Sequence, residues 1–254
     1  MGWAVRRRFF ILLLVGGVLV AFIAVVLISV FTKTPSCFDG IQNQDEEGID
    51  CGGSCQYLCT DLQRPPTVLF TKTISNGAGR TDVVASVENV NATAAAKSVP
   101  YTVTIYGDKQ VFVQEVTGTL DLPPSSTVPV FISGVSTGNQ KVLHAFLAIA
   151  SSSPQWFSMT NNQNVKPVVS NSTLGGATTT PRVDAILSNA SVVTLSDVPI
   201  IIFVHDEQGE IIAASKTILP TIPAQGQATA TFTWGFPFVR SPAAIEVIPV
   251  AVLP

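Results

Sequence analysis

Residues 9–31, FFILLLVGGVLVAFIAVVLISVF, decide how the whole chain is organised. This stretch holds 23 residues without one charged side chain, and only Gly16, Gly17 and Ser29 are not plainly apolar. A helix of that length covers about 34 Å at a rise of about 1.5 Å per residue, enough to cross a hydrocarbon core of about 30 Å. The sequence therefore predicts a transmembrane helix over residues 9–31.

Two other interpretations of this stretch are weaker. A buried core helix is rarely this long without a polar face, and the apolar region of a cleavable signal peptide usually spans only about 7–15 residues. No Ala-x-Ala cleavage site lies near the end of the stretch, and Cys37 follows Thr34-Pro35-Ser36, which is no lipoprotein signal. We expect an uncleaved anchor.

The charges on either side of the stretch predict its orientation. Arg6, Arg7 and Arg8 come directly before it, whereas Lys33 is the only basic residue close behind it. The positive-inside rule then predicts residues 1–8 to be a short cytoplasmic tail. We expect a single-pass protein of the plasma (inner) membrane with an extracytoplasmic body.

Composition narrows the class of that body. The 254 residues carry a net charge of −3 and only 12% charged side chains, so no basic surface indicates nucleic-acid binding. Val, Thr, Ser, Ala, Pro and Gly dominate after residue 60, a mixture typical of short strands joined by tight turns. The expected fold class is mainly β, and the expected partners are the membrane and other envelope or surface proteins, or further copies of the chain.

All four cysteines lie in the segment 35–60, directly after the anchor; they are Cys37, Cys51, Cys55 and Cys59. Outside the cytoplasm, such a cluster in a segment too small for its own core predicts two disulfides. The spacing leaves all three pairings open. A four-cysteine zinc site is the alternative, but its ligands usually come in close Cys-x2–4-Cys pairs, and Cys37 stands well apart.

The same segment is rich in acids. Asn43, Asp45 and Glu47 place oxygen ligands at alternate positions before Gly48, as in the first half of a calcium loop. The twelfth position is Ser54, which supplies no bidentate carboxylate. A calcium ion held by Asn43, Asp45, Glu47 and Asp50 is therefore one hypothesis, and a solvated acidic turn is the other.

This segment also carries a resemblance. Residues 37–55 read C-x-D-G-x-x-N-x-x-E-x-G-x-D-C-G-G-x-C, which resembles a short cysteine motif of bacterial secreted and surface proteins, commonly found next to β-sandwich repeats. The resemblance implies a cell-surface or envelope setting and carries no activity.

After Pro65-Pro66 the chain repeats itself at an offset of about 100 residues. Residues 82–89, DVVASVEN, match 182–189, RVDAILSN, and residues 99–106, VPYTVTIY, match 198–205, VPIIIFVH. Leu122-Pro123 likewise matches Ile222-Pro223. Agreement in both order and spacing predicts two homologous domains, over 66–150 and 167–254, joined by a linker over 151–166.

Within each copy, apolar and polar residues alternate as they do in half-buried strands. Short strands about 8–12 residues apart predict an immunoglobulin- or fibronectin-III-like sandwich. The order of events in each copy, from a strand ending in Asn to a Leu/Ile-Pro step, resembles the FxLYD-type domains of bacterial envelope proteins. In the linker, we expect Trp156 and Phe157 either to pack between the domains or to form an exposed contact patch.

No catalytic pattern accompanies this fold. The chain has two histidines, His144 and His205, and lacks a nucleophile elbow, a Walker loop, a dinucleotide fingerprint and a His-Glu-x-x-His motif. We expect no enzyme, but a membrane-anchored scaffold or adhesive binding module that presents tandem sandwiches. The alternatives are a pilus-like subunit of a surface assembly, for which the expected glutamate and Gly-Phe processing site are missing, and a calcium-dependent adhesion module.

Overall fold

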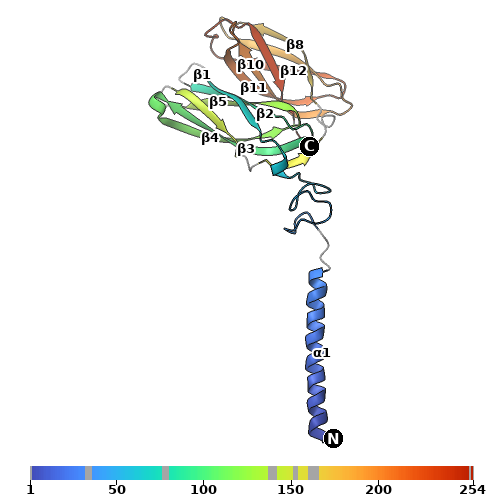
Figure 1. The fold of residues 1–254 in the computed structure, drawn as a ribbon. Helices are drawn as coiled ribbons and strands as arrows, with labels where there is room; N and C mark the ends of the chain where they lie inside the picture. Colours follow the sequence, from blue (N-terminus) through green and yellow to red (C-terminus); the bar gives the residue numbers. More distant parts are fainter. Residues whose placement is uncertain are drawn as a thin grey trace. The chain divides into compact units, whose positions relative to one another are not determined.

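The computed structural model describes residues 2–31, 36–75, 80–136, 142–150, 154–159, 166–251 and 253. The chain divides into two compact units, Met1–Cys55 and Gln56–Pro254. The first contains one long helix and the acidic cysteine segment, and the second is built from antiparallel strands (Figure 1). The predicted fold class, mainly β with a single N-terminal apolar helix, is confirmed.

Helix α1 spans Trp3–Phe31 and so begins six residues before the predicted start. Arginine is a good helix former, and the helix continues back through the three arginines, with the Arg7 guanidinium 5.6 Å from the centre of the Trp3 ring. Its stretch from Arg6 to Ile28 is long and apolar enough to cross a membrane, and none of it is buried inside the protein. The predicted tail over 1–8 is therefore helical from Trp3 onward.

The first sandwich pairs two antiparallel sheets. One has the strand order β1-β2-β5, and the other has the order β4-β3-β6, with β7 added along β3. Its elements are β1 (Thr67–Ser75), β2 (Arg80–Asn89), β3 (Ala94–Gly107), β4 (Phe112–Leu122), β5 (Ser126–Ser136), β6 (Val142–Ala148) and β7 (Trp156–Ser158), with short 3-10 turns at Thr60–Leu62 and Asp108–Gln110.

The second sandwich uses the same arrangement. Its sheets have the orders β8-β9-β12 and β11-β10-β13, so that each strand takes the place of one in the first sandwich. Its strands are β8 (Val168–Gly175), β9 (Arg182–Ser188), β10 (Leu195–His205), β11 (Ile211–Ile222), β12 (Gln227–Thr233) and β13 (Ala244–Pro249).

Alternation along the strands places one core between the sheets of each sandwich. Val83, Ala85 and Val87 of β2 are at most 1% exposed and belong to the first core. Val183 and Leu187 of β9 are fully buried in the second. Burial alternates with a period of two along β9, whereas on β2 residues 82–87 are all buried, because Val84 on its other face packs against the second sandwich.

The ladder registers of the two sandwiches also agree. Ala85 lies between Thr71 and Val130, and Ala185 lies between Ser172 and Ala230. These equivalent rows are separated by about 100 residues, which is the offset seen in the sequence. Descent of the two halves from one ancestral domain stays a prediction.

A buried asparagine ends β2 and another closes the turn after β9. The Nδ2 group of Asn89 donates to the carbonyl oxygens of Ala94, Leu122 and Pro123 at 2.8, 3.3 and 2.8 Å. Asn189 donates to those of Val193, Ile222 and Pro223 at 2.8, 3.3 and 3.0 Å. Both side chains therefore satisfy three backbone acceptors that the ladders leave unpaired.

A third apolar cluster joins the two sandwiches. Val84 and Ile74 of the first pack with Ile201, Phe203 and Ala214 of the second, and all five are at most 7% exposed. An exposed ion pair, Lys72 Nζ to Glu210 Oε2 at 2.7 Å, also links the two sandwiches. The sheets β1-β2-β5 and β11-β10-β13 therefore meet face to face, and the other sheet of each sandwich lies outside this contact.

The predicted position of Trp156 is wrong. It lies in β7, which pairs with β3, and its side chain is 1% exposed inside the core of the first sandwich. Because β7 extends a sheet, alternate residues point inward, and Phe157 points instead toward Ala95, Met159 and Leu253. Residues 151–153 and 160–165 of the predicted linker lie outside the described residues.

The end of the chain returns to the first sandwich. β13 is the last strand of the second sandwich and ends at Pro249. Beyond it, Leu253 is 2% exposed against Ala95 and Met159, and its N–H donates to Asp121 Oδ2 at 3.4 Å. The tail therefore ties the second sandwich to the first.

Candidate functional site

The cysteine segment is closed by disulfides, as predicted. Cys37 and Cys55 are bonded to each other, with their Cα atoms 5.6 Å apart. Cys51 and Cys59 are disulfide-bonded as well, and no described cysteine is free. The zinc interpretation is therefore wrong, because disulfide sulfurs cannot act as thiolate ligands.

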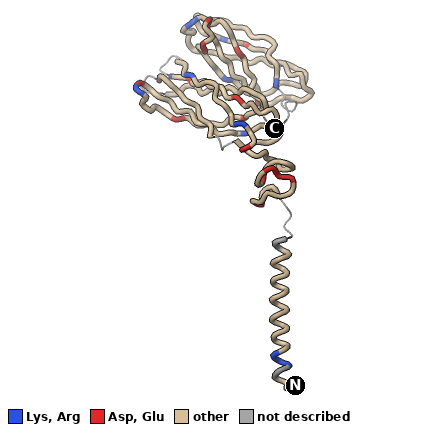
Figure 2. The backbone as a smooth tube through the Cα atoms, viewed as in Figure 1, with Lys and Arg blue, Asp and Glu red and all other residues tan. Residues whose placement is uncertain are grey.

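The acids of this segment hold its backbone in place. The Asp50 carboxylate accepts the N–H groups of Asp39 and Gly40 at 3.0 to 3.1 Å. The Asp39 carboxylate accepts the N–H of Ile41 and the side-chain amide of Asn43, both at 3.0 Å. Short polar side chains that bind nearby N–H groups favour tight turns over regular structure, which accounts for so many acids in a loop without strands. Figure 2 shows these acids gathered along the segment.

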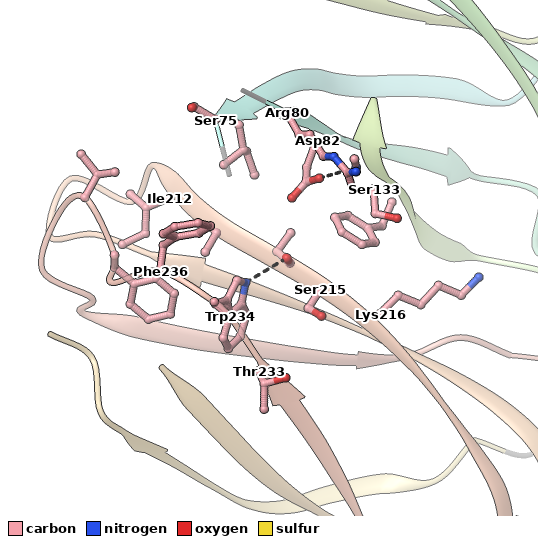
Figure 3. Close-up of a pocket in the computed structure, with 18 of the residues that line it drawn as sticks. Ser75, Arg80, Asp82, Ser133, Ile212, Ser215, Lys216, Thr233, Trp234 and Phe236 are labelled. Carbon is pink, nitrogen blue, oxygen red and sulfur yellow. Dashed lines mark hydrogen bonds between the residues drawn. The ribbon is translucent and has the colours of Figure 1, made fainter. Parts of the chain in front are cut away.

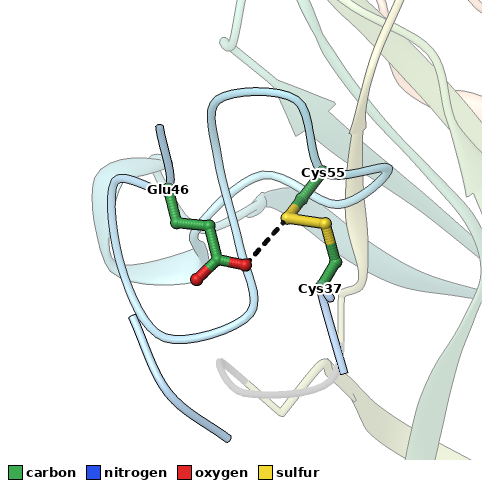
Figure 4. Close-up of side chains that lie close together, drawn as sticks. All are labelled: Cys37, Glu46 and Cys55. Carbon is green, nitrogen blue, oxygen red and sulfur yellow. Dashed lines mark hydrogen bonds between the residues drawn. A yellow bond between two sulfur atoms is a disulfide. The ribbon is translucent and has the colours of Figure 1, made fainter. Parts of the chain in front are cut away.

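The four predicted calcium ligands do not form one cluster here. Among the described acids, histidines and cysteines, the group whose ligand atoms lie within 4.8 Å of one another is Cys37, Glu46 and Cys55, drawn in Figure 4. Both of its sulfurs are in the disulfide, so the 3.3 Å approach of Cys55 Sγ to Glu46 Oε1 is a contact without a donated proton.

Each predicted calcium ligand has a local environment of its own. Asp45 accepts the Ser54 hydroxyl at 2.7 Å, and Asp50 binds backbone N–H groups. A Cβ on Gly52 would lie 2.6 Å from the Glu47 side chain, so these residues pack closely. The Asn43 Oδ1 atom is buried without a hydrogen-bond partner in the part of the chain that the structure describes.

Calcium binding stays a prediction, and chelation tests it on the full chain. If the ion holds this segment, chelator should lower the temperature at which the protein unfolds, because a ligand that binds only the folded state stabilises that state. An unchanged unfolding temperature would contradict the hypothesis and leave the solvated acidic turn.

A hollow lies at the contact between the two sandwiches, with a volume of about 1280 Å³. The first sandwich contributes residues of β1, β2 and β5 to its lining. The second contributes the run from Ile212 to Ile218 of β11 and the segment from Thr233 to Val239. Figure 3 shows these side chains facing one another across the cleft.

One wall of the cleft is aromatic. Trp234 and Phe238 meet edge to face with ring centres 5.2 Å apart, and Phe236 beside them is 52% exposed. The indole N–H of Trp234 donates to the carbonyl oxygen of Ala214 at 3.1 Å, so the ring is held against β11. This wall offers rigid apolar contact area, which is enriched at binding surfaces.

The other wall carries charge. Asp82 is only 6% exposed and accepts the N–H of Gly134 at 2.7 Å. Arg80 on this wall and Lys216 on β11, the side of the aromatic wall, also line the cleft, and neither forms an ion pair with any described residue. The cleft therefore presents two cationic groups to a ligand, whereas its one carboxylate is buried.

The histidines do not belong to this cleft. The His205 ring nitrogens lie 3.2 Å from the Gly209 carbonyl oxygen and 3.2 Å from Glu246 Oε2, at the turn after β10. His144 lies exposed on β6 of the first sandwich. The prediction that the chain is not an enzyme stays a prediction.

Sequence reasoning missed the cleft. Its aromatic wall is the run Trp234-Gly-Phe236-Pro-Phe238, three aromatic residues at alternate positions directly after β12. That density of exposed aromatics was the available signal. Its opposite wall comes from β1, β2 and β5, between about 100 and 160 residues earlier, and no local pattern brings the two together.

No protein-family model matches this chain, and no curated protein matches it. The resemblances to the bacterial cysteine motif and to FxLYD-type domains therefore stay resemblances, and any function must be argued from the disulfides, the apolar helix and the cleft.

Proposed function

We propose that this chain is a single-pass envelope protein whose extracytoplasmic body is a non-enzymatic binding module or scaffold. Helix α1 has the length and composition of a membrane anchor, and Arg6, Arg7 and Arg8 favour a cytoplasmic N-terminus. The disulfides support an oxidising compartment outside the cytoplasm. The membrane would be the plasma (inner) membrane, with the tandem sandwiches on its outer side.

The observation that carries the proposal is the cleft between the sandwiches. Binding sites are usually concave, largely apolar and lined by a few placed polar groups, and they form preferentially where two domains meet. This cleft has an aromatic wall at Trp234 and Phe236, cationic groups at Arg80 and Lys216, and a buried apolar contact beside it. That contact favours a preformed site.

A pilus-like subunit, the alternative, requires contact between copies of the chain. The outward face of β8-β9-β12 carries the exposed ion pair of Arg182 and Asp184, with Asp184 also accepting the Thr231 hydroxyl at 2.6 Å. Charged and hydroxyl groups on this face favour solvent over another sheet, so we place the subunit function second.

Site-specific photo-cross-linking on intact cells tests the proposal. A benzophenone side chain at Phe236 in the full-length protein should yield adducts with another envelope component, because this half-exposed ring lines the cleft. The matched position is Thr229, exposed on β12 away from the cleft, where we expect no such adduct.

Two results would overturn the proposal. Adducts between copies of the chain at both positions would favour the assembly subunit. Absence of adducts at Phe236 would remove the binding function.

A further inference from the structure

Resting on the proposed binding function, we propose that the cleft takes an extended polypeptide segment that adds as a strand to the open edge of β11. The segment would place an aromatic or large apolar side chain against Trp234 and Phe236, and an acidic side chain near Arg80 and Lys216. The occupant is thus a peptide segment of another envelope protein, bound mainly through its backbone.

The open edge is the first support. β11 ends the sheet order β11-β10-β13 and pairs with β10 alone among the described strands. Seven successive residues of it, from Ile212 to Ile218, line the cleft. An edge strand presents a row of N–H and C=O groups on which another strand can form.

The hydrogen bond from Trp234 shows which backbone groups face outward. Its indole binds the carbonyl oxygen of Ala214, so that carbonyl points away from β10. In an antiparallel pair, the groups that face the partner alternate from residue to residue, and the register from Ala213 to Ile222 is unbroken. The N–H and C=O groups of Lys216 and Ile218 therefore also point away from β10, and Ala214 is already occupied.

Side chains of a bound strand would meet different walls. Successive residues of a strand point to opposite faces, and residues two apart lie about 7 Å from each other on one face. A large side chain could then cover the aromatic wall at Phe236, which is 52% exposed, while another reaches Lys216. Such pockets for alternate side chains give selectivity to strand addition.

Charge defines the ligand further. Arg80 and Lys216 form no ion pair within the described part of the chain, and Asp82 is buried against the Gly134 N–H. A carboxylate on the ligand would complement these cations. A lysine on an open edge also discourages pairing with a second copy of the same edge, so Lys216 selects an acidic strand over self-association.

The test uses the full-length protein in lipid nanodiscs and a display library of random dodecapeptides. We expect enriched peptides that share one aromatic and one acidic residue. In the best peptide, N-methylation of successive amides should weaken binding at least tenfold at every second position and leave the positions between unchanged, because only alternate amides face β11. This scan leaves the protein unaltered.

Two variants and one control locate the site. Lys216→Glu and Phe236→Ala should each weaken binding about tenfold, since both side chains are exposed enough for the fold to tolerate the change. Lys109 lies in the exposed turn after β3 of the first sandwich and does not line the cleft. Lys109→Glu should therefore leave affinity unchanged. Uniform tolerance of N-methylation, or insensitivity to both variants, would overturn strand addition.

A glycan array probed with the same nanodiscs separates this inference from the proposed function. Glycan binding that depends on Phe236, without peptide enrichment, would overturn the peptide ligand and leave the binding module in place. Loss of both signals, together with no adduct at Phe236 on cells, would overturn the two proposals together.

Discussion

Equivalent faces of the two sandwiches differ in whether another sheet or solvent covers them. In the sheet β1-β2-β5, one ladder row reads Lys72, Val84 and Phe131, and Val84 is fully buried against the second sandwich. The equivalent row of β8-β9-β12 reads Thr173, Asp184 and Thr231, and the Asp184 side chain is 34% exposed. The same ladder position is thus apolar where a sheet covers it and charged where none does.

The other pair of faces shows the same difference. Ile201 and Phe203 of β10 are each 3% exposed in the contact between the sandwiches. Their equivalents on β3 are Thr102 and Thr104, which are only partly buried on the outward face of β4-β3-β6. Residues that point into a sandwich make its core, and residues that point outward determine whether another sheet packs on that face. Polar outer faces at both ends would stop the stack at two, as capping repeats do.

The strongest test exchanges one residue between the two rows. Val84→Asp should destabilise the protein by about 4 kcal/mol, because it buries a carboxylate in the contact while its ladder neighbour Lys72 is already paired with Glu210. Guanidinium unfolding of the full chain in detergent, followed by tryptophan fluorescence, measures this. Trp156 reports the first core and Trp234 the cleft.

The mirror exchange is the control. Asp184→Val lies on the outward face of the second sandwich and should leave the free energy of unfolding nearly unchanged. Equal effects of the two exchanges would mean that the sandwiches do not pack through Val84.

A second exchange probes the opposite side of the contact. Phe203→Thr should cost about 3 kcal/mol, because it removes a buried ring and leaves a cavity among Ile74, Val84 and Ala214. Thr104→Phe, the matched change on the outward face of β3, should alter the unfolding free energy by less than about 1 kcal/mol. A Phe203→Thr variant that unfolds like the wild type would contradict the face-to-face packing of β1-β2-β5 on β11-β10-β13.

A third test concerns what the sandwiches share. Asn89→Ala and Asn189→Ala should each cost about 2 kcal/mol, because each removes three donated hydrogen bonds and leaves carbonyl oxygens buried without partners. Denaturant unfolding of both variants checks the sizes. A large difference between them would show that Asn89 and Asn189 are not energetically equivalent, although their hydrogen bonds match.

Much of the fold could be predicted because its signals are local. Val83, Ala85 and Val87 occupy alternate positions and predicted a strand with one buried face, which the first core confirms, although Val84 on the opposite face is buried as well. Clustering of the cysteines in a short segment predicted disulfides. The sequence therefore predicted the strands, the helix and the disulfide-linked segment without any information on long-range contacts.

The contact between the sandwiches was not predictable in the same way. Val84 and Asp184 stand at matched positions of the repeat, and their difference in polarity was visible in the sequence. A single buried valine on a strand does not say which sheet covers it. The cleft depends on that packing, because Phe131 and Trp234 come from different sandwiches. Trp156 was misplaced for the same reason, since β7 pairs with a strand about 60 residues earlier.

The smallest expected effect concerns the charged row itself. The Arg182 guanidinium and the Thr231 hydroxyl hydrogen-bond to Asp184 and hold the pKa of its carboxyl below the usual value of 3.8. A carboxyl whose pKa is lowered in the folded state stabilises that state above its unfolded pKa, and the contribution disappears as the pH falls through the folded value.

Asp184→Asn should therefore lower the unfolding midpoint slightly at pH 7, and the difference from the wild type should shrink below about pH 4. Midpoints measured from pH 7 to pH 2 in matched ionic strength give this difference directly. A difference that persisted at pH 2 would mean that Asp184 acts through packing. The outward face of the second sandwich would then be less exposed to solvent than its sequence indicates.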